Sequence, residues 1–237
     1  MNMEAVLTPE IVRALRSVDT PTICNALELA IGGRSAQGFT YGTVVAAPKP
    51  MEPMIGYTRT ARIRAMSPDS RNASEARQAR LDYYRYVSGR DGVATVVVMQ
   101  DLDDRPGTGS FWGEVNSAVH QGLGVAGVVT NGSVRDLGDL SESFPILAGS
   151  VGPSHAFVHL VDIGTPVSVF GLEIQHDDIL HADRHGAVRI EARYLSELVR
   201  CVRLTQRKEA PLLAAARGGN FSIEILERAM MAADDIH

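Results

Sequence analysis

The stretch from Gly113 to Asp136 constrains the fold most, because it predicts a helix, a buried strand and a turn in direct succession. Gly113 to His120 has a helical pattern. The N–H groups in the first turn of such a helix lack partners within the helix, so they can hold a carboxylate or another anion. Val125 to Thr130 is a short apolar, β-branched run typical of a buried strand, and Asn131-Gly132 ends it.

Arg135 and Asp136 come just after the end of this predicted strand. In open α/β sheets, ligands bind at the edge where the carboxyl ends of the strands lie. An arginine there offers a bidentate cation, and an aspartate offers a hard oxygen ligand for a divalent metal. A local salt bridge or a helix cap is the commoner role for such a pair. The spacing alone therefore leaves a binding site and a structural pair as alternatives.

The composition narrows the classes of function. The chain has 237 residues, which is enough to bury a sizeable core, and 45% apolar with 22% charged residues is typical of globular proteins. A net charge of −5 without a basic tract argues against a broad nucleic-acid surface. We therefore expect no nucleic-acid partner.

The expected compartment is the cytoplasm. Cys24 and Cys201 are too few for a disulfide framework, and a reduced thiol is the simpler interpretation of each. The first residues lack a charged segment followed by an apolar core, and no apolar run reaches membrane length. We therefore expect no membrane partner.

Further strands and helices are predicted on both sides of the organising stretch. Thr8 and Thr20, each followed by proline, are expected to cap two N-terminal helices. The run from Gly92 to Met99 is the most continuous apolar segment and predicts a central strand. Other strands are expected at 55–65, 144–148 and 166–171, and helices at 74–87 and in the tail. We expect one domain over 1–237, with a core at about 20–191 and a helical C-terminal extension at 192–237.

Two clusters that contain acidic residues could bind a metal, but an ordinary structural role is the simpler explanation for each. Asp101, Asp103 and Asp104 follow the central strand, where an exposed acidic loop is the commoner outcome. A second segment mixes the ligand types of zinc and iron sites without a recognised spacing. For it we favour hairpin turns and solvated side chains over a second metal site. Its members are His176, Asp177, Asp178, His181, Asp183 and His185.

The organising stretch resembles a known family. G-E-x-x-x-A from Gly113, followed by G-V-x-G-V-V-x-x-G-x-V-R-D ending at Asp136, is similar to the RraA-like family. That family contains the regulator of ribonuclease E activity A and the class II 4-hydroxy-4-methyl-2-oxoglutarate aldolases. The resemblance covers about residues 20–222. It implies an α/β/β/α sandwich of the swivelling-domain type with flanking N- and C-terminal helices, assembled as a homotrimer or hexamer with sites between subunits.

The resemblance also implies a chemistry. A divalent-metal-dependent lyase would cleave a 2-oxo acid and release pyruvate, by retro-aldol cleavage or by decarboxylation of an oxaloacetate-like acid. As a hypothesis, Asp136 holds Mg²⁺ or Mn²⁺, Arg135 neutralises the enolate oxygen, and Glu114 takes part in proton transfer. The backbone of Gly113, Glu114, Val115 and Asn116 would hold the substrate carboxylate.

Glu209 resembles a family glutamate that reaches into the neighbouring subunit's site, although an exposed charge on a solvated helix fits it nearly as well. The competing class of function is a protein-binding regulator of the ribonuclease E type without catalysis. A third possibility, an inactive structural oligomer, draws on three departures from the family pattern. Asn25 stands where aspartate is common, and His176 and Asp177 stand where proline and glycine are usual.

Overall fold

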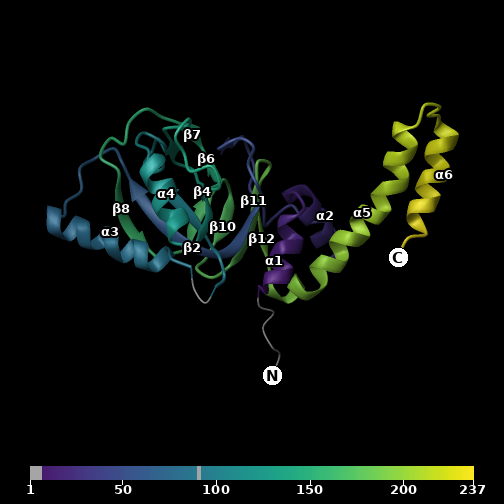
Figure 1. The fold of residues 1–237 in the computed structure, drawn as a ribbon, viewed down its shortest axis with the longest axis horizontal. Helices are drawn as coiled ribbons and strands as arrows, with labels where there is room; N and C mark the ends of the chain where they lie inside the picture. Colours follow the sequence, from purple (N-terminus) through teal and green to yellow (C-terminus); the bar gives the residue numbers. More distant parts are fainter. Residues whose placement is uncertain (1–6, 90–91) are drawn as a thin grey trace, which may run out of the picture.

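The computed structural model describes residues 7–89 and 92–237, and its centre is a curved mixed sheet flanked by helices (Figure 1). The helices are α1 (Pro9–Arg16), α2 (Thr20–Ile31), α3 (Ala73–Val87), α4 (Glu114–Gly122), α5 (Leu195–Arg217) and α6 (Ile223–Asp234), with a short 3₁₀ turn at Ala192–Tyr194. The strands are β1 (Val45–Ala47), β2 (Met54–Arg64), β3 (Thr95–Asp101), β4 (Val125–Thr130), β5 (Ser133–Val134), β6 (Ile146–Ala148), β7 (Ser150–Val151), β8 (His159–Ile163), β9 (Val167–Val169), β10 (Leu172–Ile174), β11 (Ile179–Asp183) and β12 (Gly186–Ile190).

Eight of these strands form the main sheet, in the order β1-β6-β4-β3-β2-β11-β12, with β8 paired to β2. β3 runs parallel to β2 and β4, and β4 runs parallel to β6, so the carboxyl ends of β3 and β4 share one edge. Asn131 joins these two ends, because its amide accepts from the N–H of Asp101 at 2.7 Å and donates to the carbonyl of Asp101 at 2.9 Å. The two hydrogen bonds of Asn131 therefore fix the start of the loop that carries Arg135 and Asp136.

The core explains why the sequence around β3 is continuously apolar. Val97 and Met99 face a cluster beneath α3 and α4, while Val96 and Val98 face the β9–β10 hairpin. A strand buried on both faces needs no polar alternation. A third cluster joins α1, α2 and α5 to the β11–β12 end of the sheet. This mixed α/β arrangement confirms the expected fold class and the expected central strand.

The N-terminal cap of α1 is the residue that the sequence predicts, and the N-terminal cap of α2 is a different residue. Thr8 caps α1 as expected, accepting from the N–H of Ile11 at 3.3 Å. The expected cap at Thr20 is wrong, because Asp19 caps α2 by accepting from the N–H of Thr22 at 3.0 Å. Thr20 is the first residue of the helix instead, and its hydroxyl bonds to a buried histidine.

The loop after β3 is not the exposed acidic loop that the sequence predicts. Asp101 and Asp103 are buried, at 2% and 7% exposure, and only Asp104 faces solvent. Asp101 accepts from the N–H groups of Asp103 and Gly107, and Asp103 accepts from the N–H of Ala65 at 2.6 Å. Main-chain donors thus compensate for the burial of both carboxylates.

The C-terminal helices form a hairpin that projects from the rest of the chain (Figure 1). The first half of α5 packs against α2, and α6 packs against α5. Within 7–89 and 92–237, no helix has the length and apolar character needed to cross a membrane.

Candidate functional site

Gly113, Glu114, Arg135 and Asp136 lie together at the carboxyl edge of β4. Gly113 is the residue before α4, and the N–H of Glu114 donates to Oδ2 of Asp136 at 3.2 Å. The Nε atom of Arg135 lies 3.7 Å from the same oxygen. Both charged side chains are about one-third exposed, so their ion pair adds little stability and both groups remain accessible. The sequence left a salt bridge and a helix cap as structural roles for this pair. Both contacts are present, and both side chains are still accessible.

The backbone around Arg135 and Asp136 holds this geometry. The N–H of Arg135 donates to the carbonyl of Trp112 at 3.0 Å, which ties the loop to the segment just before α4. Asp136 adopts φ 56, a left-handed conformation in which aspartate is among the better-tolerated side chains. Its carbonyl accepts from the N–H of Asp139 at 2.9 Å and closes the turn. The Asp136 carboxylate is therefore aimed at the start of α4 by the main chain.

Gly113 leaves no space for a side chain unless the Asp136 carboxylate moves. A Cβ atom there would lie 2.4 Å from Oδ2 of Asp136 and 3.1 Å from Cγ of Arg135. Its φ of −168 is extended and suits any residue, so the constraint comes from the two neighbouring side chains. Glycine at this position lets the chain approach both charged groups closely.

The first turn of α4 also offers main-chain donors. Among the described residues, the N–H groups of Val115 and Asn116 have no hydrogen-bond acceptor. The Asn116 side chain is occupied elsewhere, since its Nδ2 donates to the carbonyl of Phe111 and its Oδ1 accepts from the hydroxyl of Tyr84 at 2.9 Å. Asn116 can therefore serve the site through its backbone alone.

A buried histidine within α4, which the sequence did not single out, joins this helix to α3. His120 is fully buried, and its Nδ1 donates to the carbonyl of Asn116 at 2.6 Å. Because that nitrogen carries the proton, Nε2 accepts from the hydroxyl of Tyr83 at 2.7 Å. The ring also packs against Trp112, with centroids 4.6 Å apart. The sequence could have indicated this role, because His120 lies one turn after Asn116 on the buried face of the helix.

Burial lowers the pKa of His120 from its usual 6.5 to about 4. The unfolded chain therefore binds more protons between these values, and stability falls as the pH falls through this window. We expect the wild type to lose roughly 2 kcal/mol from this group between pH 7 and pH 5, and His120→Gln to lose less. Urea unfolding of both proteins at the two pH values checks this. An identical pH dependence in the variant would rule out His120 as the source.

Glu209 lies on α5 and is not brought to Arg135 within one chain. Its Oε1 accepts from Nδ2 of Asn25 on α2 at 3.3 Å. An aspartate at position 25 would place two carboxylates against each other, so the amide suits this contact better than the usual family residue. The contribution of Glu209 to a neighbouring subunit's site stays a prediction.

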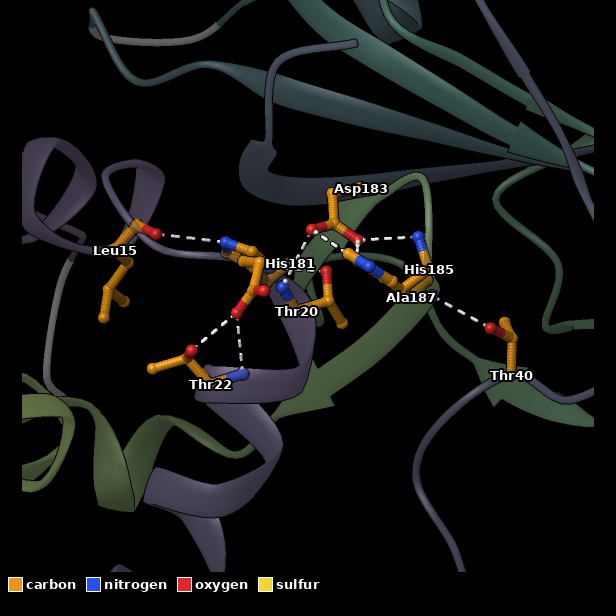
Figure 2. A network of polar contacts seen from close by, with 9 residues as sticks. Leu15, Thr20, Thr22, Thr40, His181, Asp183, His185 and Ala187 are labelled. Atoms are coloured by element: carbon orange, nitrogen blue, oxygen red, sulfur yellow. Dashed lines mark hydrogen bonds and ion pairs between the residues drawn. The ribbon is translucent and has the colours of Figure 1, made fainter. Parts of the chain in front are cut away.

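The histidines and aspartates of β11 and the following turn form a structural network (Figure 2). The expectation of solvated side chains is wrong for His181 and Asp183, which are both buried. His181 donates to the carbonyl of Leu15 and accepts from Thr20, both at 3.0 Å, and burial lowers its pKa. Asp183 accepts from the N–H groups of Thr20 and His185. These bonds fasten α1 and α2 to the sheet.

His176 and Asp177 also have structural partners. The hydroxyl of Tyr86 donates to Nδ1 of His176 at 2.9 Å, and Nε2 of His176 lies 3.1 Å from Asp177. Asp177 pairs with the buried Arg59 and adopts φ 66, where a glycine would be unstrained. The two residues that depart from the family pattern therefore both have partners within this chain. In the described part of the chain, no group of three or more His, Cys, Asp or Glu residues could hold a metal.

The fold and the loop at the end of β4 define the class of protein. The family model described as RraA-like, Aldolase/RraA, matches residues 20–189. The chain therefore belongs to the RraA-like family. This family includes both aldolases and inhibitors of ribonuclease E, so membership alone leaves a catalytic and a regulatory role open.

One curated protein is similar in sequence to part of this chain. An uncharacterized protein of Methanocaldococcus jannaschii, MJ0644, is 31% identical over 102 residues, which is 42% of this chain and 49% of that protein. The chain thus matches about half the length of this curated relative.

Two solved structures resemble the whole arrangement. An uncharacterized protein from Pseudomonas syringae pv. tomato has a TM-score of 0.70 at 20% identity, covering 98% of each chain. Streptomyces coelicolor RraAS2, described as an unusual member of the RNase ES inhibitor RraA protein family, has a TM-score of 0.65 at 23% identity, covering 86% of this chain and 95% of its own. At these identities, the likeness supports the fold alone.

Proposed function

We propose that this protein is a divalent-metal-dependent lyase that cleaves a 2-oxo acid and releases pyruvate. One observation carries the proposal. The Asp136 carboxylate, the Arg135 guanidinium and the start of α4 converge on one accessible point at the carboxyl edge of the sheet. A surface that only binds a protein has no need of a metal ligand beside a bidentate cation.

The residues present suit a hydrated Mg²⁺ or Mn²⁺ ion. Mg²⁺ commonly keeps several waters and binds through one or two carboxylates, so a cluster of three or more protein ligands is not required. Asp136 would hold the ion, and its carboxylate is accessible while its backbone is fixed. The exposed Glu114 begins the adjacent helix. When bound, the metal would supply Lewis-acid polarisation of the substrate's oxygens.

Groups of the chain itself would bind the substrate carboxylate, stabilise the enolate and transfer the proton. The free N–H groups of Val115 and Asn116 and the end of the α4 dipole would bind the substrate carboxylate. When the carbon–carbon bond breaks, its electron pair moves to the carbonyl of the pyruvate unit, and Arg135 would neutralise the resulting enolate oxygen. Glu114 would move the proton that completes pyruvate. In decarboxylation the other product is carbon dioxide, and in aldol cleavage it is a carbonyl compound.

The test is pyruvate release from oxaloacetate and from 4-hydroxy-4-methyl-2-oxoglutarate, with Mg²⁺ or with EDTA. We expect release by the wild type only with the metal, and a loss of at least about tenfold in Asp136→Asn. Asparagine still accepts from the N–H of Glu114 and tolerates the left-handed backbone, so this variant removes the charge and keeps the turn. Equal release with and without metal, or by the variant, contradicts the assignment.

Failure of both substrates under every metal would favour the regulator, and a pull-down with ribonuclease E would then be the next measurement. The homotrimer or hexamer and the cytoplasmic location expected from the sequence stay predictions.

A further inference from the structure

A cleft lined by cationic side chains lies between α3 and the segment 155–160, at the end of the molecule away from the α5–α6 hairpin (Figure 1). Its volume is about 560 Å³, which is within the range of small-molecule sites. The described residues that line it do not include Gly113, Glu114, Arg135 or Asp136. The cleft is therefore separate from the site proposed for lyase chemistry.

The two walls of the cleft are joined by Arg71, which lies just before α3. Its guanidinium donates to the carbonyl of Leu160 on β8, and its Nη2 lies 2.9 Å from Oδ2 of Asp69. Asp69 is the acidic residue among those that line the cleft, and this pairing occupies its carboxylate. The cleft is therefore formed before a ligand binds, which lowers the entropic cost of binding.

Two arginines of α3 remain available to a ligand. Arg77 and Arg80 line the cleft, and neither forms an ion pair within residues 7–89 and 92–237. They are three positions apart, so their side chains leave the helix on the same side. Cζ of Arg80 lies 6.0 Å from the centroid of the Phe111 ring, which helps to place the guanidinium. In a chain of net charge −5, this cleft is locally positive and favours an anion.

Two histidines on the opposite wall can both accept and donate hydrogen bonds. Nδ1 of His155 lies 2.8 Å from the carbonyl of Ala156, and Nδ1 of His159 lies 2.8 Å from the carbonyl of Phe157. Each Nδ1 therefore carries a proton. Within the described part of the chain, Nε2 of neither ring has a hydrogen-bond partner. Nε2 accepts a hydrogen bond in this tautomer, and it donates one when the ring is protonated.

We propose that this cleft binds the phosphate group of a small molecule. A phosphate presents three acceptor oxygens in tetrahedral directions, so the arginines of one wall and the histidines of the other can bind it together. Its singly protonated form also offers a hydroxyl to a neutral histidine nitrogen. An ionised carboxylate is planar, with two oxygens and no hydroxyl, so it suits one wall better than two. Phe157 lines the cleft and is 56% exposed, which gives an organic group a surface to pack on.

Isothermal titration calorimetry of the intact protein in EDTA tests the site with phenyl phosphate, inorganic phosphate and benzoate. We expect both phosphates to bind, and benzoate to bind at least about tenfold more weakly than phenyl phosphate. Combining Arg77→Gln with Arg80→Gln removes both charges and keeps good helix formers, so phenyl phosphate should bind this variant at least about tenfold more weakly. Arg85→Gln removes an exposed arginine of the same helix that does not line the cleft, so it should keep the wild-type affinity. Circular dichroism verifies that each variant is folded.

A second control separates this cleft from the start of α4, which is also proposed to hold an anion. Arg135→Ala should leave the affinity for phenyl phosphate unchanged, because Arg135 does not line the cleft. An affinity that falls in Arg135→Ala and not in the double variant would place the phosphate at the start of α4 and overturn the proposal. Because calorimetry measures binding alone, the result does not depend on the lyase activity.

The two phosphate probes also distinguish the sources of the group. Tighter binding of phenyl phosphate, with the difference lost in Phe157→Ala, supports an organic phosphate, and equal binding of the two supports free phosphate. No binding of either probe, benzoate binding as tight as phenyl phosphate, or an unchanged affinity in the double variant would each overturn the proposal. If the double variant fails to fold because Arg80 contacts Phe111, the exposed Arg77→Gln change alone should still weaken binding about threefold. An unchanged affinity in that single variant would equally overturn the proposal.

Discussion

Replacing Arg135 with alanine is expected to lower the rate of pyruvate release about 100- to 1000-fold, the range seen when one preorganised charge-stabilising group is removed. The side chain is one-third exposed and its only ion pair within the described residues is the loose contact with Asp136. Its loss should therefore change the free energy of unfolding by no more than about 0.5 kcal/mol. Steady-state kinetics and urea unfolding of the same preparation measure the two effects.

Two further variants sharpen the Arg135 result. Arg135→Lys keeps a positive charge but loses the planar fork, so only part of the rate should return. Arg184→Ala removes an exposed arginine from a distant turn and should leave the rate unchanged. An Arg135→Ala protein that loses stability in proportion to activity would show that Arg135 is a structural residue.

A single methyl group at position 113 is expected to lower activity nearly as much, by about 100-fold. The added Cβ of Gly113→Ala would lie 2.4 Å from Oδ2 of Asp136, so the carboxylate must move and release the N–H of Glu114. That movement would displace the charge on which the proposed chemistry depends, and small displacements of a catalytic group are costly. Kinetics with a metal titration measure both the rate and the apparent affinity for Mg²⁺.

Gly138→Ala is the matched control. It lies two residues after Asp136, and a Cβ there would meet nothing within 4 Å. We expect this variant to keep the wild-type rate within about twofold. If both alanine variants are equally active, the close approach at Gly113 is unimportant for function.

The local elements were predictable because short stretches of the chain carry their signals. The apolar, β-branched run from Val125 to Thr130 is β4 with the same bounds, and the helical pattern from Gly113 gives α4. The position of Arg135 and Asp136 beyond a strand end follows directly from these two elements. The structure brings Gly113, Glu114, Arg135 and Asp136 together, and their roles in a functional site stay predictions.

Two of the errors concern polar side chains whose partners come from distant parts of the chain. Asp103 is buried because the N–H of Ala65, 38 positions earlier, reaches it. His181 is buried because Thr20 and Leu15 satisfy its ring from the N-terminal helices. A polar residue in the sequence predicts an exposed side chain, because the sequence pattern does not show which hydrogen-bond partners the fold will bring to that residue.

The sequence by itself determined the strand, the helix and the turn that carry the candidate site, because hydrophobic periodicity and glycine positions act over a few residues. Only the tertiary structure decided that Asp136 caps the helix beginning at Glu114, that His120 binds Tyr83 beneath it, and that Glu209 meets Asn25. These contacts join residues 22, 37 and 184 positions apart. Their partners are chosen by the packing of separate elements, for which local patterns carry no signal.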